Sequence, residues 1–183
     1  MKLCFVTVGA TASFEKLIEQ VLSPQFLETL AERRYTHLLI QYGKGGSEAF
    51  SSFANGKQSA HGLTIGGFES KPSLDEELLM TTKRGDQEKG LIISHAGTGS
   101  ILAAMRIGTP LIVVPNPDLA DNHQEELAQI LQEQKYVVSS SVQEIRTLVV
   151  ARAELQKTQI FDSHPEIQDE HAGFMSDDLG FLD

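Results

Sequence analysis

The segment from Leu91 to Pro115, LIISHAGTGSILAAMRIGTPLIVVP, constrains the fold more than any other part of the chain. Two short apolar runs, LIIS and PLIVVP, flank the stretch GTGSILAAMRIG. This stretch has two glycines near its start, and the residues after them are typical of a helix. Continuous apolar runs of this length are typical of strands buried on both faces of a sheet. A strand, a helix and a second strand in this order favour a parallel pair joined by a crossover helix.

The same alternation continues along most of the chain. Strands are predicted at Leu3–Gly9, His37–Gly43, Gly62–Phe68, 91–94, 110–115 and 135–140. Helices are predicted at 13–34 with an N-cap at Ser13 and a break before Pro24, from Ser73, at 97–108, at 121–134 and at 141–157, and the segment 44–60 reads as a loop with one short helix. We therefore predict an α/β fold with a Rossmann-like, mostly parallel sheet that carries helices on both faces.

Composition limits the other possibilities. No apolar run approaches the roughly 20 residues that a membrane-spanning helix needs, and the start of the chain is expected to be that of a mature cytosolic protein. Of the net charge of −10, residues 154–183 carry −7 through eight acidic side chains and one lysine. An almost neutral body with an acidic tail does not suit a nucleic-acid backbone. The expected domains are a Rossmann-like domain at 1–155 and an acidic tail at 156–183, while the single Cys4 is expected to be a buried, inert thiol.

In parallel sheets of this kind, ligands bind beyond the carboxyl ends of the strands. Three loops are expected at that edge, namely Gly9–Ser13, Ser94–Ser100 and Pro115–Gln124. Each joins a predicted strand to a predicted helix, so each could hold a ligand or could be only a turn. Their expected position side by side favours a shared site.

The loop SHAGTGS carries the clearest ligand signal. Gly97 and Gly99 lack Cβ atoms, so the backbone there can approach a ligand closely. The following helix start offers free amides and the positive end of a dipole to a phosphate, while Thr98, Ser100 and His95 add side-chain donors. The alternative is a helix start whose glycines serve tight packing. The spacing is neither the G-x-G-x-x-G fingerprint nor a phosphate-binding GK[ST] loop.

Two further loops add polar groups at the same edge. Asn122, His123 and Gln124 at a helix start could bind sugar hydroxyls, or could be an ordinary polar first turn capped by Asp121 or Asn122. The turn VGATASF offers Gly9 and small polar residues as a second anion site, or as a simple strand-to-helix turn. The remaining histidines have no ligand-like spacing, so no metal site is predicted.

Together these motifs resemble the C-terminal, nucleotide-sugar-binding half of family-28 glycosyltransferases. Within that family they are most similar to the eukaryotic two-subunit UDP-GlcNAc transferases of N-glycan precursor assembly. The resemblance spans about residues 3–138 and rests on the VTVGAT turn, LIQYG, the GF and KPSL segment, ISHAGTGSIL and DNHQEELA, in this order.

The resemblance implies the donor-binding half of a GT-B glycosyltransferase. A separate membrane-anchored subunit would bind the acceptor and recruit this cytoplasmic chain to the cytosolic face of the endoplasmic reticulum. The implied reaction transfers GlcNAc from UDP-GlcNAc to dolichyl-diphosphate-GlcNAc with inversion, without a metal or other cofactor. The acidic tail is a possible partner-binding segment. The alternatives are a non-catalytic nucleotide-sugar-binding module and a self-sufficient homodimeric transferase with another acceptor.

The resemblance also implies roles for single residues, with one departure. The implied donor-binding residues are Gly97, Thr98, Gly99 and Ser100 at the diphosphate with His95 at its edge, Asn122, His123 and Gln124 near GlcNAc, and Gly9, Ala10 and Thr11 by the cleft that faces the partner. The general base is unknown and expected from the partner, with His95 and His123 as other candidates. Bacterial relatives hold the ribose with a glutamate after this loop, whereas residues 101–104 offer no acid.

Overall fold

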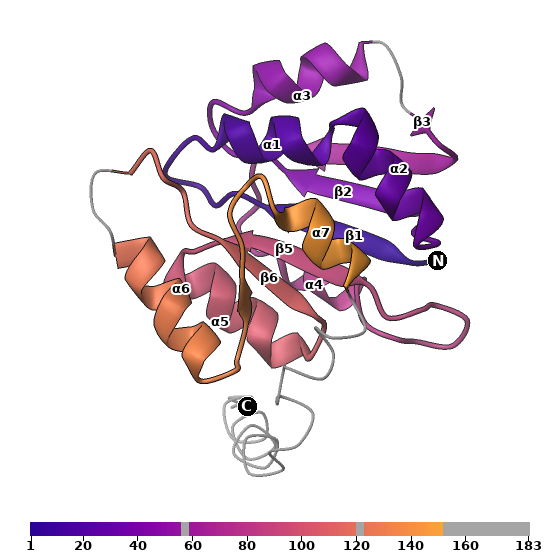
Figure 1. The fold of residues 1–183 in the computed structure, drawn as a ribbon. Coiled ribbons are helices and arrows are strands. Elements are labelled where there is room, and N and C mark those ends of the chain that lie inside the picture. Colours follow the sequence, from indigo (N-terminus) through magenta and orange to yellow (C-terminus); the bar gives the residue numbers. More distant parts are fainter. Residues whose placement is uncertain (56–58, 120–122, 152–183) are drawn as a thin grey trace, which may run out of the picture.

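A computed structural model of the chain describes residues 1–55, 59–119 and 123–151 (Figure 1). The strands are β1 (Leu3–Thr7), β2 (His37–Gln41), β3 (Ser59–Ala60), β4 (Leu63–Phe68), β5 (Leu91–His95), β6 (Leu111–Val114) and β7 (Val138–Ser139). The helices are α1 (Glu15–Val21), α2 (Pro24–Glu32), α3 (Ser47–Ala54), α4 (Asp75–Leu79), α5 (Thr98–Ile107), α6 (His123–Glu133) and α7 (Ile145–Val150).

The strands form one sheet in the order β3-β4-β2-β1-β5-β6-β7. Among the described residues, every pairing is parallel except that of the two-residue β3 with β4, and β3 is the one strand there that the sequence pattern did not predict. Counted in chain order without β3, the strands run 3-2-1-4-5-6, which is the order of a Rossmann fold. The predicted mostly parallel, Rossmann-like sheet is therefore confirmed. The order reverses between β1 and β5, where such folds bind ligands.

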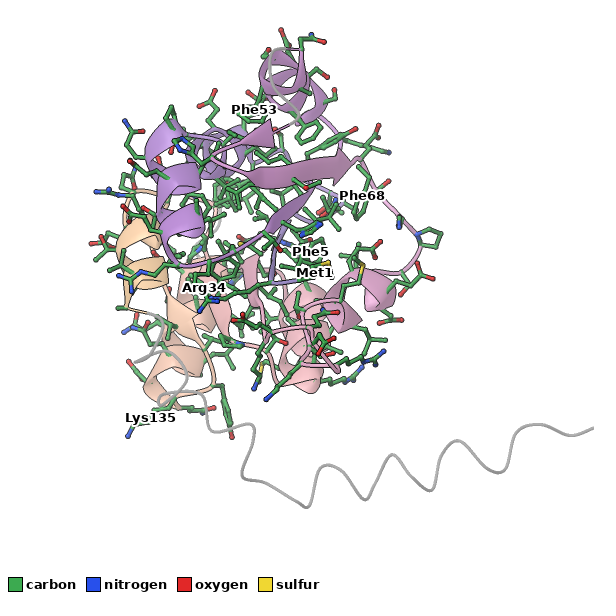
Figure 2. All side chains as sticks on the ribbon, turned by 90° about the vertical axis from the view of Figure 1, so that its right-hand side faces the viewer. Met1, Phe5, Arg34, Phe53, Phe68 and Lys135 are labelled. Carbon is green, nitrogen blue, oxygen red and sulfur yellow. The ribbon has the colours of Figure 1, made fainter. Side chains whose placement is uncertain are left out.

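Helices cover both faces of this sheet, as predicted (Figure 1). One face packs against α1, α2, α3 and α7, and the other packs against α4, α5 and α6. Successive residues of β1 alternate between the two cores, because Cys4 and Val6 join the first and Phe5 joins the second. Figure 2 shows Phe5 in the interior, while Lys135 points outward.

The helix starts differ from the predictions for α1, α4 and α7. Helix α4 was predicted from Ser73 and begins at Asp75, with Leu74 at the N-cap position. Ser13 does not cap α1, since the helix starts two residues later and the Ser13 hydroxyl instead bonds the Glu15 carboxylate at 3.3 Å. Phe14 occupies the N-cap position and is only 2% exposed, so the burial of its ring decides where the helix begins. The predicted break is confirmed, because Ser23 caps α2 by accepting a hydrogen bond from the Phe26 amide at 3.3 Å.

The last helix, predicted at 141–157, begins later, because α7 covers Ile145–Val150 and Ser141 bonds the Glu144 side chain at its start. The proposed domain boundary at 155 and the acidic tail lie outside the described residues. Within the described ranges, no helix has both the length and the apolar content to cross a bilayer.

Candidate functional site

The loops after β1 and β5 meet at the carboxyl edge, where the strand order reverses. Gly9 follows β1, and a Cβ atom placed on it would lie 2.5 Å from both Cε1 and Nε2 of His95. Gly9 therefore packs directly against the imidazole. Its φ of +81° also requires a residue that tolerates the left-handed region.

Gly97 also contacts the Nε2 end of the same ring. A Cβ atom on Gly97 would lie 2.2 Å from Nε2 of His95, so the imidazole sits between two glycines. Gly97 has an ordinary extended backbone, with φ −83° and ψ 128°. The sequence suggested that Gly97 lets a ligand approach the backbone. In the structure, the missing Cβ at Gly97 makes room for His95.

His95 is partly buried, and its Nδ1 atom is buried without a hydrogen-bond partner among the described residues. Burial lowers the pKa of His95, and the Thr7 backbone nearby opposes this shift without completing a hydrogen bond to Nδ1. The imidazole is therefore neutral at pH 7, with one nitrogen as donor and the other as acceptor.

The N-terminus of α5 is open beside this ring. Gly97 supplies no side-chain cap, and the first amide bonded within the turn is that of Ile101, which donates to Gly97 O at 3.0 Å. Among the described residues, the amides of Thr98, Gly99 and Ser100 have no acceptor. Thr98 and Gly99 are exposed, and a Cβ on Gly99 would meet no atom within 4 Å. Three free amides and the positive end of a ten-residue helix thus face open space, an arrangement that binds anions.

Hydrogen bonds hold the β6–α6 loop against the β1–α1 loop. The buried Asn116 donates from Nδ2 to the Ser13 carbonyl at 2.9 Å, and its backbone amide donates to Gln124 Oε1 at 3.1 Å. Asp118 forms an exposed ion pair with Lys16 at 2.6 Å. Gln124 was predicted to bind a sugar. That role stays a prediction. In the structure its Oε1 atom orders this loop, and its amide nitrogen has no hydrogen-bond partner among the described residues.

The structure brings most of the predicted site residues to this one edge. His123 starts α6 with an 81% exposed side chain, and its Nδ1 atom lies 3.7 Å from the Glu126 carboxylate. Ala10 and Thr11 are exposed in the β1–α1 loop. Asn122 lies outside the described residues.

Sequence reasoning missed two residues that shape this edge, Gln41 and Asn116. Both are buried polar residues, at 2% and 6% exposure. Gln41 ends the apolar run HLLIQ, and Asn116 stands between two prolines just after LIVV. A lone amide side chain at the end of a buried strand was the available signal, because a buried amide needs partners.

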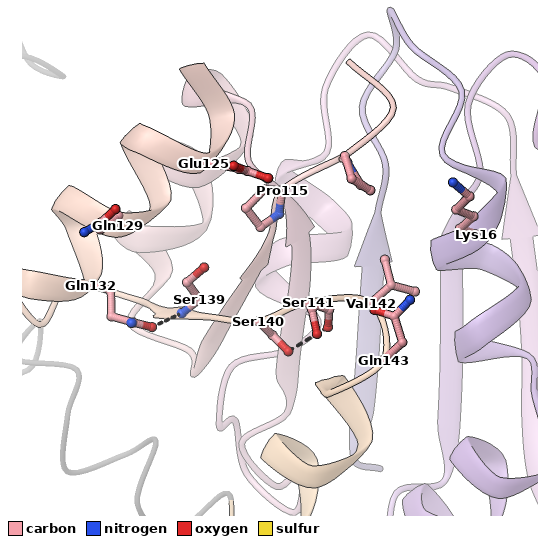
Figure 3. A pocket seen from close by; sticks show the side chains of 11 residues that line it. Lys16, Pro115, Glu125, Gln129, Gln132, Ser139, Ser140, Ser141, Val142 and Gln143 are labelled. Atoms are coloured by element: carbon pink, nitrogen blue, oxygen red, sulfur yellow. Dashed lines mark hydrogen bonds between the residues drawn. The ribbon is translucent and has the colours of Figure 1, made fainter. Parts of the chain in front are cut away.

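A cavity of about 500 Å³ lies between the β6–α6 loop, α6 and the segment that follows β7 (Figure 3). Eight of its eleven lining residues are polar or charged, although most of the surface they expose to it is apolar, and none of residues 94–100 lines it. The cavity is therefore separate from the free amides of α5. Its lining comprises Lys16, Pro115, Pro117, Glu125, Gln129, Gln132, Ser139, Ser140, Ser141, Val142 and Gln143.

Among the residues that the structure describes, metal-binding side chains do not gather at this edge. Across residues 1–55, 59–119 and 123–151, no three His, Cys, Asp or Glu residues come close enough to hold an ion. That the protein needs no metal stays a prediction.

Comparisons with a protein-family model and with curated proteins both identify glycosyltransferase relatives of this chain. The model of the glycosyltransferase family 28 C-terminal domain matches residues 3–171. A protein of Yarrowia lipolytica is 38% identical over 161 residues, which cover 85% of this chain and 76% of the relative. A protein of Saccharomyces cerevisiae is 34% identical over 169 residues, covering 83% and 84%. A human protein is 37% identical over 139 residues, covering 75% of this chain and 11% of the relative. All three are named UDP-N-acetylglucosamine transferase subunit ALG13.

Two solved structures share the fold. The NMR solution structure of ALG13 matches with a TM-score of 0.61 and 30% identity, over 86% of this chain and 87% of that one. The crystal structure of Acinetobacter baumannii MurG matches with a TM-score of 0.59 and 18% identity, over 87% of this chain and 43% of that one. The second likeness concerns the fold alone.

Proposed function

Because the chain belongs to the glycosyltransferase family 28 C-terminal domain family, we propose that it is the donor-binding, catalytic subunit of an inverting UDP-GlcNAc transferase. The acceptor is dolichyl-diphosphate-GlcNAc, which a membrane-anchored second subunit presents at the cytosolic face of the endoplasmic reticulum. The relatives named as transferase subunits support the need for a partner. The observation that carries the donor role is the set of three free amides at the start of α5, beside His95.

The donor site explains how this chain would lower the reaction barrier. The amides of Thr98, Gly99 and Ser100 bind the diphosphate, and the neutral His95 donates one N–H at its edge. Negative charge grows on the UDP leaving group as the glycosidic bond breaks. Donors that are already in place stabilise this charge in the transition state without reorganising. The helix dipole adds to this effect, so that no bound metal is required.

The sugar-binding side of the site is formed by Asn122, His123 and Gln124. The exposed position of His123 at the start of α6 leaves its ring open to a ligand, and the free nitrogen of Gln124 can donate to a hydroxyl. Gly9, Ala10 and Thr11 lie by the cleft that faces the partner.

The acceptor hydroxyl must lose a proton during inversion, so a general base is needed. His95 is confined between Gly9 and Gly97, with its Nδ1 atom buried. This confinement suits a fixed donor better than a base that must reach a second substrate. We therefore propose that the base comes from the partner subunit.

A reconstitution assay tests the proposal. The purified chain is mixed with UDP-GlcNAc and a phytanyl-diphosphate-GlcNAc acceptor, with and without membranes that hold the co-purified partner, and each reaction is repeated with EDTA. We expect UDP binding by the chain alone, transfer only with the partner, and no loss of activity with EDTA. Transfer by the chain alone would instead identify a self-sufficient enzyme. UDP binding without transfer in the presence of the partner would identify a non-catalytic module.

A further inference from the structure

The side chain of Gln41 connects the end of β2 to the β1–α1 loop. Gln41 lies opposite Thr7 in the parallel register of β1 and β2, and it is 2% exposed. Its Oε1 atom accepts hydrogen bonds from the Thr7 hydroxyl at 2.7 Å and from the Gly9 amide at 3.1 Å. Its Nε2 atom donates to the carbonyls of Gly9 at 2.8 Å and Glu69 at 2.9 Å.

These four bonds use the whole capacity of the amide, which can accept two hydrogen bonds and donate two. They also determine its orientation, because the two backbone carbonyls can only accept and so must face the nitrogen. A glutamate at this position would turn oxygens toward two carbonyls, and a methionine would offer no polar atom. Glutamine is therefore the side chain that satisfies all of these partners.

Gly9 is the residue that links Gln41 to the candidate site. Gln41 holds both the amide and the carbonyl of Gly9, while the other side of Gly9 packs against the His95 ring. The ring in turn packs against Gly97, the N-cap of α5. A substitution at Gln41 can therefore displace Gly9, and Gly9 can displace the His95 ring beside the free amides of α5. Gln41 itself need not touch a ligand.

We infer that Gln41 is a positioning residue of the donor site, which holds Gly9 against His95 and so sets the place of the imidazole beside the α5 amides. A side chain that only ties β1 to β2 would affect stability and nothing else. A positioning residue also changes the environment of the His95 ring and the affinity for a diphosphate. The second effect rests on the proposed function, whereas the first does not.

The test uses the full chain and two readouts. The ring ¹⁵N signals of His95 report its environment, and calorimetry with UDP reports the donor site. The variants Gln41→Glu and Gln41→Met are compared with a control, Gln25→Glu. The control also changes a glutamine to a glutamate, but at an exposed position of α2. Both Gln41 variants should shift the His95 ring signals and weaken UDP binding by about tenfold or more, since small displacements near a site have large effects. The Gln25 variant should do neither.

Folded Gln41 variants with unchanged His95 signals would overturn the inference. Shifted signals with undiminished UDP affinity would overturn its second half, the link to the donor site. If the wild-type chain does not bind UDP, the proposed function fails, and the His95 signals still decide whether Gln41 positions the ring. If neither Gln41 variant unfolds cooperatively, Thr7→Val removes one of the four bonds and is judged by the same two readouts.

Discussion

Gly97 and Gly99 share one motif, and the structure predicts opposite consequences when each is changed to alanine. The new methyl group at Gly97 would lie 2.2 Å from Nε2 of His95. Movement of that ring is restricted, because Gly9 also packs against its Nε2 and Cε1 atoms. The methyl group at Gly99 would meet no protein atom within 4 Å.

The effects on stability follow from these contacts. Gly97→Ala should lower the free energy of unfolding by about 1–3 kcal/mol, as is typical of an overpacked site. Gly99→Ala should raise it by about 0.4–1 kcal/mol, because alanine restricts the unfolded chain and suits a helix. Urea denaturation of the two variants and the wild type measures both differences.

The effects on UDP binding should single out Gly99. Cβ atoms on a helix tilt toward its N-terminus, so the methyl group at Gly99 would enter the space in front of the free amides. We expect the affinity for UDP to fall about tenfold, or about 1.4 kcal/mol, in a variant that is more stable than the wild type. Calorimetric titration with UDP measures this loss.

Two results would contradict the reasoning. Wild-type affinity in the stable Gly99 variant would show that the diphosphate does not bind in front of these amides. Wild-type stability in the Gly97 variant would show that the His95 ring is not confined as the structure indicates.

Three further predictions concern residues elsewhere in the fold. Burial raises the pKa of the Cys4 thiol, so iodoacetamide should label it only as fast as the chain unfolds, and rapid labelling of the native chain would contradict this. Burial lowers the pKa of His95, so the unfolded chain binds the proton more readily below pH about 6.5. Relative to His95→Gln, the wild type should therefore lose stability as the pH falls through that value toward the folded-state pKa, by at most about 1.4 kcal/mol per pH unit, and parallel pH curves for the two proteins would refute this. Ser23→Ala removes the cap of α2 and should cost about 1 kcal/mol in urea denaturation, whereas Ser51→Ala on the exposed side of α3 should cost little.

Much of the fold follows from local patterns. Apolar runs such as LIVV have the length and composition of buried strands, and the helices between them show a periodicity of their own. Because these signals are local, the sequence predicts which elements form and that the three loops lie at one edge. Ser13 shows the limit of this reasoning. Its capping propensity predicted an N-cap at Ser13, and the burial of Phe14 moved the N-cap of α1 by one residue.

The free amides of α5 were also predictable, because every helix start leaves such groups and SHAGTGS places no side-chain cap on them. The sequence alone therefore determined the succession of strands and helices along the chain, the sheet edge at which the three loops meet, and the uncapped start of α5. Only the tertiary structure decided that the His95 ring fills the space between Gly9 and Gly97, and that Gln41 clamps Gly9. These contacts join residues at the carboxyl ends of β1, β2 and β5. The three strands are neighbours only because of the strand order of the sheet. No local periodicity encodes that order, because it results from packing the whole sheet.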